Sequence, residues 1–257
     1  MKIDYKKENQ TYWEKRAEGY SKVNQEELST AQHQKWQQFL DRQIKEQFGE
    51  KKKSEIRILE VGTGPGFFAI ILSELGYQVT AVDYTKEMLH QARQNAKAYG
   101  QSPCFLEMDA QNLTFSSETF DVVLSRNLTW DLPDPERAYR EWVRVLSRDG
   151  LMMVFDANWY GYLFDDAKRD LYNKDREQTK ERGIRDEYTG TDIDSMEKIA
   201  REAPLSKIIR PAWDRRVLSQ IGVRQIETVE QVWQEVWSEE EKINFSATPM
   251  FLVKGRK

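Results

Sequence analysis

The sequence predicts an α/β fold built on a mostly parallel β-sheet. Between residues 55 and 158, short apolar runs with strand character alternate with segments of helical periodicity, and a glycine-rich turn follows the first run. Such alternation is typical of right-handed βαβ units, whose strands lie parallel in one sheet. The length of 257 residues fits one domain of ordinary size with a small appendage.

Four segments follow from this pattern. Residues 1–53 are polar around one amphipathic helix, so we expect an N-terminal helical cap, and residues 54–160 contain the alternating core. Residues 161–215 are highly charged and look helical without a strand, which is typical of a lid inserted before the last strands. Residues 216–257 return to weak strand signals and would complete the sheet.

The individual elements follow from periodicity and from helix start and stop signals. In the cap, apolar residues recur at helical spacing before Gly49, namely Trp36, Phe39, Leu40, Ile44 and Phe48. In the core, strands are expected at 56–61, 78–82, 104–108, 120–124 and 151–155, and helices at 67–75, at 85–99 and from Pro135 onward. The lid is helical over 163–203, and the last two strands are expected at 223–229 and 245–253.

Composition excludes several classes of protein. The 39 basic and 43 acidic residues give a net charge of −4, which argues against a general nucleic-acid binder. An aromatic content of 12% is too high for a disordered chain. A single cysteine, Cys104, excludes an internal disulfide and a cysteine-based zinc cluster, and two histidines exclude a metal site built mainly on imidazole. We expect no metal, and Cys104 as a small core residue.

Neither a targeting segment nor a membrane span is expected. The first residues lack the apolar stretch of a signal peptide, and no run approaches the roughly 18 apolar residues of a transmembrane helix. We therefore expect a cytoplasmic protein without a membrane partner.

The turn after the first strand predicts a ligand site. Gly62, Gly64 and Gly66 permit positive φ and close approach of a ligand to the backbone. The turn also places a helix N-terminus at the carboxyl edge of the sheet, where an anionic or electron-rich group binds well. The spacing G-x-G-x-G, followed by Phe67, departs from the G-x-G-x-x-G of dinucleotide-binding folds, and no Walker lysine follows. A nicotinamide-dependent enzyme is disfavoured and a P-loop is excluded.

Two acids close later strands at the same edge. Asp83 ends the second strand, where a carboxylate can accept two hydrogen bonds from a ribose diol. Asp109 ends the third strand, where it can accept a hydrogen bond from an adenine amino group. The alternative for both acids is a helix cap or a solvated loop position.

Taken in order, these segments resemble the class I S-adenosylmethionine-dependent methyltransferases. The matching stretches are residues 58–66, 81–83, 108–110, 120–125 and 145–150. The resemblance implies a Rossmann-like, doubly wound seven-stranded sheet, mostly parallel, whose last hairpin is antiparallel. Residues 12–21 resemble the N-terminal segment of the small-molecule methyltransferases in this family.

The resemblance also implies cofactor contacts and roles. The methionine part of the cofactor would lie against the first loop, at Glu60, Gly62, Gly64 and Gly66, and its ribose at Asp83. Asp109 and Ala110 would meet the adenine, and Tyr84 and Met88 would flank the adenosine. Tyr20 would close over the cofactor, and Arg126 would line its pocket. The alternative for Tyr20 is packing of a helix on the domain.

Acceptor residues are expected after strands four and five and from the caps. We expect Asn127, Trp130, Trp159, Tyr160 and Arg210 to bind substrate, with Arg210 pairing a substrate carboxylate. Asp156 and Asn158 are the candidate catalytic residues, which would orient the acceptor, and Asp156 is the candidate base. The alternatives are that Trp159 and Tyr160 anchor the lid and that Arg210 is a surface residue.

The sequence therefore predicts an enzyme that transfers a methyl group from S-adenosylmethionine to a small molecule by in-line displacement. The chain lacks the Asn/Asp-Pro-Pro-aromatic motif of nucleobase amino-methyltransferases after strand four, which counts against a nucleic-acid substrate. Two alternatives stay open, a protein or peptide methyltransferase and a non-catalytic cofactor-binding protein. The acceptor, the methylated atom and the oligomeric state do not follow from the sequence.

Overall fold

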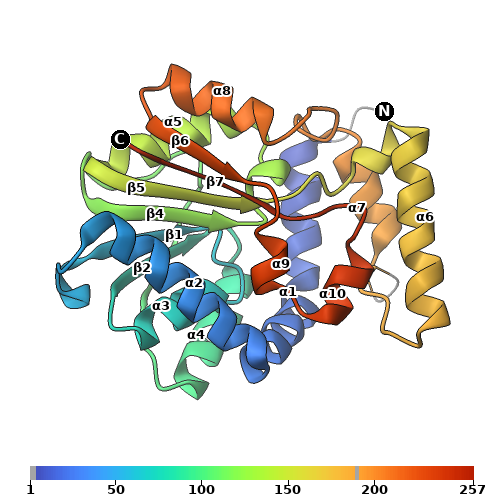
Figure 1. The fold of residues 1–257 in the computed structure, drawn as a ribbon, viewed down its shortest axis with the longest axis horizontal. Coiled ribbons are helices and arrows are strands. Elements are labelled where there is room, and N and C mark those ends of the chain that lie inside the picture. The colour runs from blue at the N-terminus through green and yellow to red at the C-terminus, as the bar shows by residue number, and fades with distance from the viewer. Residues whose placement is uncertain (1–3, 189–190) are drawn as a thin grey trace.

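A computed structural model describes residues 4–188 and 191–257 and shows one seven-stranded sheet (Figure 1). The strand order is β3-β2-β1-β4-β5-β7-β6. The strands are β1 (Arg57–Val61), β2 (Gln78–Asp83), β3 (Cys104–Glu107), β4 (Phe120–Arg126), β5 (Leu146–Asp156), β6 (Arg224–Val229) and β7 (Phe251–Arg256). Strands β1 to β5 pair in parallel, and β7 is antiparallel to both β5 and β6. The expected fold class is confirmed.

Helices cover both faces of the sheet. On one face lie α2 (Ala31–Phe48), α3 (Phe67–Glu74) and α4 (Lys86–Ala98), and on the other α5 (Pro135–Val145) and α8 (Ala212–Gln220). The remaining helices are α1 (Tyr5–Ser29), α6 (Asp166–Glu181), α7 (Ile193–Ala200), α9 (Trp233–Val236) and α10 (Glu239–Asn244). Single 3₁₀ turns occur at Lys53–Glu55, Thr129–Asp131 and Gly161–Leu163.

Aromatic side chains join the helices to the sheet on both faces. Trp36 of α2 is fully buried, and its ring centre lies 4.8 Å from that of Phe68 and 5.3 Å from that of Phe155. On the opposite face, Tyr139 and Trp142 of α5 are fully buried with their ring centres 5.4 Å apart. Edge-to-face packing of this kind stabilises a core beyond the burial of its area. The two layers hold the strands, and hence their carboxyl ends, in a fixed arrangement.

Two details differ from the expected elements. The segment expected as a strand over 245–253 contains β7 only from Phe251 onward, because its first residues form the turn that follows the helix α10. The Ser238 side chain and Glu241 form a capping box, a strong helix start signal. Cys104 is exposed and is not a core residue, because β3 is the edge strand of the sheet.

Of the segment expected as a cap, α1 lies at the carboxyl ends of the parallel strands, as do α6 and α7 of the expected lid, whereas α2 packs on a face of the sheet. In Figure 1, α6, α7 and α10 stand beyond the arrowheads of β4 and β5, and α1 runs close to α7. Residues 1–3 of the expected cap and 189–190 of the expected lid lie outside the described residues. The side chains of Asp165 and Asp192 cap the first turns of α6 and α7, which sets where these helices begin.

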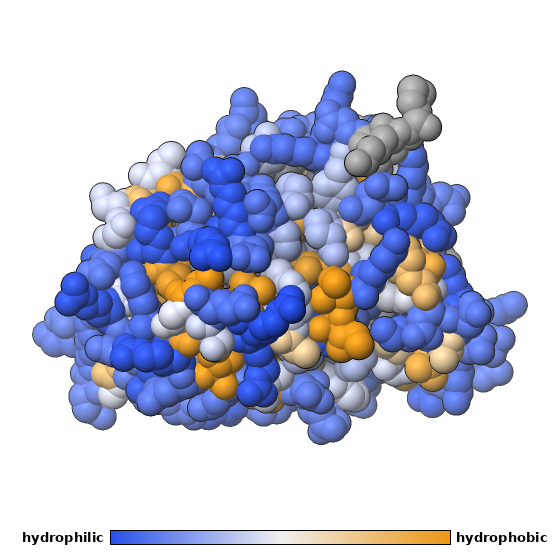
Figure 2. Space-filling view, turned by 90° about the horizontal axis from the view of Figure 1, so that it is seen from above, coloured by the Kyte–Doolittle hydropathy of each residue, from blue (hydrophilic) through white to orange (hydrophobic). Residues whose placement is uncertain are grey.

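Hydrophilic residues cover most of the face shown in Figure 2, and hydrophobic residues show there only in separate patches. This pattern agrees with a chain in which 32% of the residues are charged. Within the described ranges, no helix combines the length and the apolar character that crossing a bilayer requires.

Candidate functional site

A cavity of about 310 Å³ opens at the carboxyl edge of the sheet. Its walls come from one side of α1, the loops after β1 to β5, the region around α10 and three residues of the expected lid, Glu187, Tyr188 and Thr191. A volume of this size is at the lower end of the range for small-ligand sites.

The glycine turn forms the floor of this cavity. The backbone N–H groups of Gly62 and Thr63 donate to the carbonyl of Val82 at 2.8 and 3.0 Å, which holds the turn against β2. A Cβ on Gly62 would lie 2.6 Å from Leu128 Cδ2, so a side chain here would require Leu128 to move, and the φ of +70° also favours glycine. Gly62 and Gly64 both line the cavity, as the sequence predicts.

Gly66, the third glycine of the turn, lies outside the cavity and against α4. Its φ is +91°, and a Cβ there would lie 3.2 Å from the Cβ of Ala92 on α4. It is not among the cavity residues, so the expected cofactor contact does not fit Gly66. Its role is to let α3 begin in close contact with α4.

The carboxylate of Asp83 is fixed by two backbone amides. Gly64 N–H donates to its Oδ2 at 2.9 Å and Thr85 N–H to its Oδ1 at 2.8 Å. Burial raises the pKa of Asp83, and these two hydrogen bonds oppose the rise. Each oxygen keeps a lone pair, and Asp83 lines the cavity together with Tyr84 and Met88. Two fixed acceptors side by side are suited to a diol.

Glu60 lies beneath the turn with only 2% of its surface exposed. It accepts a hydrogen bond of 2.6 Å from Thr63 Oγ1, and burial raises its pKa to about 8. The carboxyl group is therefore mostly protonated at neutral pH, and it places a hydrogen-bond donor in the cavity wall.

Asp109 sits at the far side of the turn, next to Ala110, and both line the cavity. Its Oδ1 accepts from the backbone and side-chain nitrogens of Gln111 at 2.9 and 3.0 Å, and its Oδ2 from Lys6 Nζ at 3.0 Å. Burial alone would raise the pKa of Asp109, but the bonds from Gln111 and Lys6 outweigh it and lower that pKa. Lys6 also lies 5.0 Å from the centre of the Tyr84 ring.

One side of α1 forms a wall of the cavity along most of its length. Its cavity residues recur at intervals of three or four, and include Lys6, Asn9, Trp13, Arg16, Tyr20, Asn24 and Glu27. The sequence predicts only Tyr20 among them. The helical spacing of these residues was a usable signal, but the wall is largely polar and so lacks the apolar stripe by which amphipathic helices are recognised.

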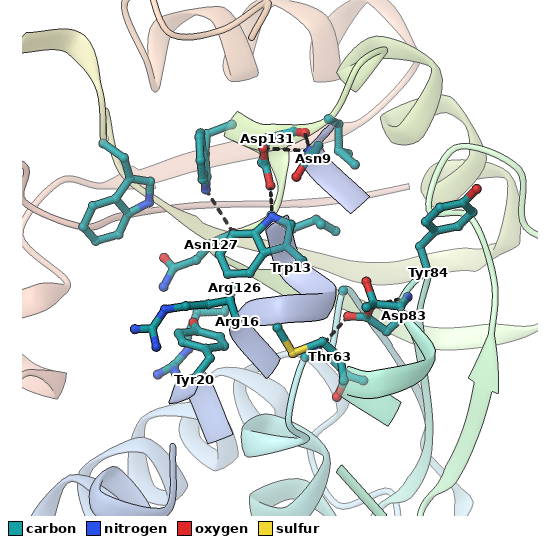
Figure 3. Close-up of a pocket in the computed structure, with 18 of the residues that line it drawn as sticks. Asn9, Trp13, Arg16, Tyr20, Thr63, Asp83, Tyr84, Arg126, Asn127 and Asp131 are labelled. Atoms are coloured by element: carbon teal, nitrogen blue, oxygen red, sulfur yellow. Dashed lines mark hydrogen bonds between the residues drawn. The ribbon is translucent and has the colours of Figure 1, made fainter. Parts of the chain in front are cut away.

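Asp131 fastens this wall to the sheet (Figure 3). Its Oδ2 accepts a hydrogen bond of 2.5 Å from Trp13 Nε1, and its Oδ1 accepts from Asn9 Nδ2 at 2.9 Å and from Tyr5 Oη at 3.2 Å. Only 5% of Asp131 is exposed, and this burial raises its pKa to about 7. The sequence analysis did not select Asp131.

The expected acceptor residues Asn127, Trp130, Trp159 and Tyr160 all line the cavity. The rings of Trp130 and Tyr160 lie 5.0 Å apart, and Trp130 Nε1 donates to the Asn127 carbonyl at 3.1 Å. Asn127 Oδ1 and Trp159 Nε1 are buried without a hydrogen-bond partner in the described part of the chain. Unpaired buried polar atoms are costly, so this end of the cavity is suited to a ligand with polar groups.

Arg126 lines the cavity on the side opposite Asp83 and Tyr84 (Figure 3). Its two terminal nitrogens donate to Glu27 at 3.0 and 2.8 Å, and its Cζ lies 4.3 Å from the centre of the Phe67 ring. Glu241 of α10 lies near this ion pair, and burial together with the charge of Glu27 raises its pKa to about 7. Neither Glu27 nor Glu241 was expected from the sequence.

Asp156 lies behind the cavity wall and does not reach the cavity. It is fully buried, and its Oδ2 accepts from Trp130 N–H at 3.0 Å and from Arg210 Nη1 at 2.6 Å. Arg210 is 3% exposed and also pairs with Asp214 at 2.6 Å. Asp156 and Arg210 neutralise each other inside the core. The structure therefore does not support a catalytic base at Asp156, nor a substrate-binding or surface role for Arg210.

Asn158 also faces away from the cavity. Its side chain bonds the backbone of Arg210, donating to the carbonyl at 3.0 Å and accepting from the N–H at 3.2 Å. It lines a separate cavity of about 100 Å³. Both ends of the Asn158 amide already bond the backbone of Arg210, near the end of the expected lid, so this side chain is not placed to orient an acceptor.

No group of three or more His, Cys, Asp or Glu side chains suited to a metal ion occurs in the described residues.

Comparison with known proteins agrees with this geometry. Residues 59–154, from β1 through most of β5, match the family model described as "Methyltransferase domain". The core is a class I methyltransferase domain of the S-adenosylmethionine-dependent type. The matched part of this methyltransferase domain contains Glu60, the glycine turn, Asp83 and Asp109.

Two curated relatives share the core of the methyltransferase. Phosphatidylethanolamine N-methyltransferase from Cereibacter sphaeroides is 37% identical over 38% of this chain and 49% of its own length. Demethylmenaquinone methyltransferase from Thermus thermophilus is 36% identical over 41% of this chain and 49% of its own length. The chain thus spans about half the length of these relatives, and α1, the lid and α10 fall outside the part matched by the family model.

A solved structure extends the likeness in fold. The putative S-adenosyl-L-methionine-dependent methyltransferase from Methanococcus maripaludis has a TM-score of 0.56 at 18% identity, covering 95% of this chain and 93% of that one. At this identity the likeness concerns the fold alone.

Proposed function

We propose that this chain transfers a methyl group from S-adenosylmethionine to a small-molecule acceptor held in the same cavity. The observation that carries this proposal is the continuity of one cavity from Asp83 and the glycine turn to the aromatic wall around Trp159. The two relatives act, by their names, on phosphatidylethanolamine and demethylmenaquinone, which agrees with a non-protein, non-nucleic-acid acceptor.

The polar groups of the cavity fit the adenosine half of the cofactor. Asp83 would accept hydrogen bonds from both ribose hydroxyls, since its two oxygens are held in place by backbone amides and keep free lone pairs. Asp109 with Ala110 would meet the adenine edge, and Tyr84 and Met88 would lie against its faces. Lys6 would close this end, because it bridges from α1 to Asp109 and Tyr84.

The methionyl half would lie over the glycine turn, beside Tyr20, whose ring packs close to Gly64. Arg16 lines the cavity on the same wall, and within the described ranges no carboxylate lies at ion-pair distance from it. We assign the cofactor carboxylate to Arg16, because a guanidinium in a partly enclosed site favours an anionic partner. Glu60, protonated below its pKa of about 8, adds a hydrogen-bond donor near the amino-acid end.

When bound, the cofactor supplies an electrophilic methyl group on sulfur. The protein's task is then to orient the acceptor and to exclude water. Asn127 Oδ1 and Trp159 Nε1 supply one acceptor and one donor for orientation. Holding two reactants at attack distance can lower a barrier by several kcal/mol, on the order found for intramolecular reactions.

Enclosure favours a small acceptor over a protein or peptide. The cavity is covered by α1, which Asp131 fastens to the sheet, and by Glu187, Tyr188 and Thr191 of the lid. We propose that residues 161–215 act as a lid and residues 1–53 as a cap, both closing over bound ligands.

The proposal is tested by incubating the protein with cofactor labelled in the methyl group and with two fractions of a cell extract, small molecules and proteins. Label is expected in the small-molecule fraction, and its transfer should fall sharply for Asp83→Ala at limiting cofactor. Label found only in the protein fraction would favour the peptide alternative. Cofactor binding without transfer to either fraction would favour a non-catalytic binding protein.

A further inference from the structure

The end of the cavity away from Asp83 is walled by aromatic rings. The centre of the Phe245 ring lies 5.6 Å from that of Trp159, 5.6 Å from that of Tyr188 and 5.7 Å from that of Trp237. These four residues come from three separate parts of the chain and all line the cavity. Together with Glu27 and Glu241 they define what we call the acceptor chamber.

Glu241 brings an acid to this chamber. It lies four residues before Phe245, which directly follows α10 and whose backbone N–H donates to the Glu241 carbonyl at 2.9 Å. Its Oε2 accepts hydrogen bonds from Ser238 N–H at 2.8 Å and from Gln32 Nε2. No donor among the described residues reaches its Oε1, and Glu241 lines the cavity.

The nearby cation is already neutralised. Arg126 gives both terminal nitrogens to Glu27, which also accepts from Asn24 Nδ2 at 3.0 Å. The Glu27–Arg126 pair is therefore internally balanced, and the carboxyl group of Glu241 stands in excess beside it. Across the whole cavity, seven carboxylic acids and three basic side chains line the walls in the described residues.

We propose that the acceptor chamber binds an organic ammonium ion, and hence that the acceptor of the proposed methyl transfer is an amine; this rests on the proposed function. The bound ammonium gives one proton to the carboxylate of Glu241, and the freed nitrogen lone pair forms the new N–C bond as the bond between sulfur and the methyl carbon breaks and S-adenosylhomocysteine leaves. The faces of the aromatic rings attract a cation, and the attraction is stronger where water is excluded. The carboxylate of Glu241 supplies the opposite charge with an oxygen that has no other partner. An acceptor bearing a carboxylate or phosphate at this end would meet repulsion from Glu241.

The cofactor's own positive charges, the sulfonium and the ammonium, belong to its methionyl half, whose carboxylate we assign to Arg16. Figure 3 shows Arg126 and Tyr20 on one side of the pocket and Asp83 with Tyr84 on the other. The adenosine site at Asp83 is thus separate from the Glu27–Arg126 pair, and Glu241 lies near that pair on α10. Loading the protein with S-adenosylhomocysteine separates the two possible partners of Glu241, because the ammonium of that ligand would already occupy Glu241 if it bound there.

The test compares phenethylammonium with its neutral isostere 2-phenylethanol, by calorimetry on the full chain loaded with S-adenosylhomocysteine. The ammonium is expected to bind at least about ten-fold more tightly, the scale of one hydrogen bond to a charged group. Equal affinity for the two probes, or tighter binding of the alcohol, would overturn the inference.

Matched variants separate the carboxylate from general effects. Glu241→Gln keeps the shape of the side chain and is expected to remove most of the ten-fold preference, whereas Glu240→Gln, an exposed neighbour on α10, should keep it. Both variants should bind S-adenosylhomocysteine within about three-fold of the unchanged protein, which shows that they are folded. A preference that survives Glu241→Gln would contradict the assignment.

A permanently charged probe gives a second readout. Affinity for benzyltrimethylammonium is expected to rise between pH 6 and pH 8, because Glu241, beside the Glu27–Arg126 pair, loses its proton over this range. The rise should be smaller in Glu241→Gln, which leaves the other cavity acids that titrate near this range, Glu60 and Asp131, in place. A flat profile would contradict the role of Glu241. If the ammonium probes bind but S-adenosylmethionine does not, the proposed function is wrong, while the inference about the acceptor chamber holds. If S-adenosylmethionine binds but the ammonium probes do not, only the inference about the acceptor chamber is wrong.

Discussion

Trp13 Nε1 donates a 2.5 Å hydrogen bond to Asp131 Oδ2, and this bond ties the first helix of the chain to the loop after β4. Asn9 and Tyr5 donate to the other carboxylate oxygen from the same helix. A side chain that follows a core strand thereby holds α1 in place over the ligand cavity. The cap is therefore part of the site and not an appendage.

Replacing Asp131 by Asn is expected to change how stability depends on pH. Burial raises the pKa of Asp131 to about 7, against about 4 in an unfolded chain. The folded state therefore holds this proton more tightly, and that stabilisation is complete below pH 4 and is lost as the pH rises through 7. Asn does not ionise, so the variant should gain about 2–3 kcal/mol relative to the unchanged protein between pH 5 and pH 8.

The measurement is urea unfolding of both proteins at the two pH values. Asp170→Asn, which changes an exposed acid on α6, is the control and should show no such gain. If the difference in the free energy of unfolding between Asp131→Asn and the unchanged protein is the same at pH 5 and at pH 8, Asp131 is not held protonated by burial.

Much of the core could be predicted because its signals are local. The strand before the glycine turn, the positive φ values at Gly62 and Gly64, and the acid that ends β2 all follow from short-range rules. Parallel strands then bring their carboxyl ends together, so residues distant in sequence, such as Gly64 and Asp83, meet at 2.9 Å.

Gly66→Ala is expected to destabilise the fold more than Gly100→Ala. Both glycines have positive φ, +91° and +66°, so both substitutions incur about 1–2 kcal/mol of backbone strain. Only at Gly66 would the new Cβ also crowd another residue, at 3.2 Å from the Cβ of Ala92, whereas nothing lies within 4 Å at Gly100. We expect roughly 1–3 kcal/mol of additional loss from this overpacking, measured by urea unfolding. Equal losses at the two positions would show that α3 and α4 adjust freely.

Asp156→Asn is expected to act on stability and not on binding. The change leaves Arg210 buried with Asp214 as its remaining carboxylate partner, at a cost of about 3 kcal/mol in the free energy of unfolding. Cofactor affinity of the folded variant should stay within about two-fold, because Asp156 does not line the cavity. If the Asp156→Asn variant kept its stability but lost methyl transfer, the result would contradict this prediction and support a catalytic role for Asp156.

Residues 163–203 should become more protected from hydrogen exchange when S-adenosylhomocysteine and phenethylammonium are bound together. Glu187, Tyr188 and Thr191 line the cavity, so ligands that fill it contact this segment directly. Peptides from α8, which contributes no cavity residue, serve as the internal comparison. Unchanged exchange across 163–203 would argue against a lid.

The acceptor end was harder to predict, because its contacts join elements far apart in sequence. Glu27 and Arg126 are 99 positions apart, and neither residue type by itself indicates an ion pair. Phe245 falls in a stretch whose apolar residues suggest a strand, while the capping box at Ser238 makes the preceding residues a helix. Asp156 and Arg210 were misplaced for a related reason: polar residues near a strand end are equally suited to a site and to a buried ion pair.

The most direct test is calorimetric titration of the full chain with S-adenosylmethionine and S-adenosylhomocysteine, with NAD as the control ligand. Micromolar binding of the first two and none of NAD is expected. Asp83→Ala should weaken this binding by about 1–3 kcal/mol, the scale for hydrogen bonds to a charged group, whereas Glu107→Ala, at the exposed end of β3, should not. A folded protein that binds neither cofactor form, or that binds NAD instead, would contradict the methyltransferase function.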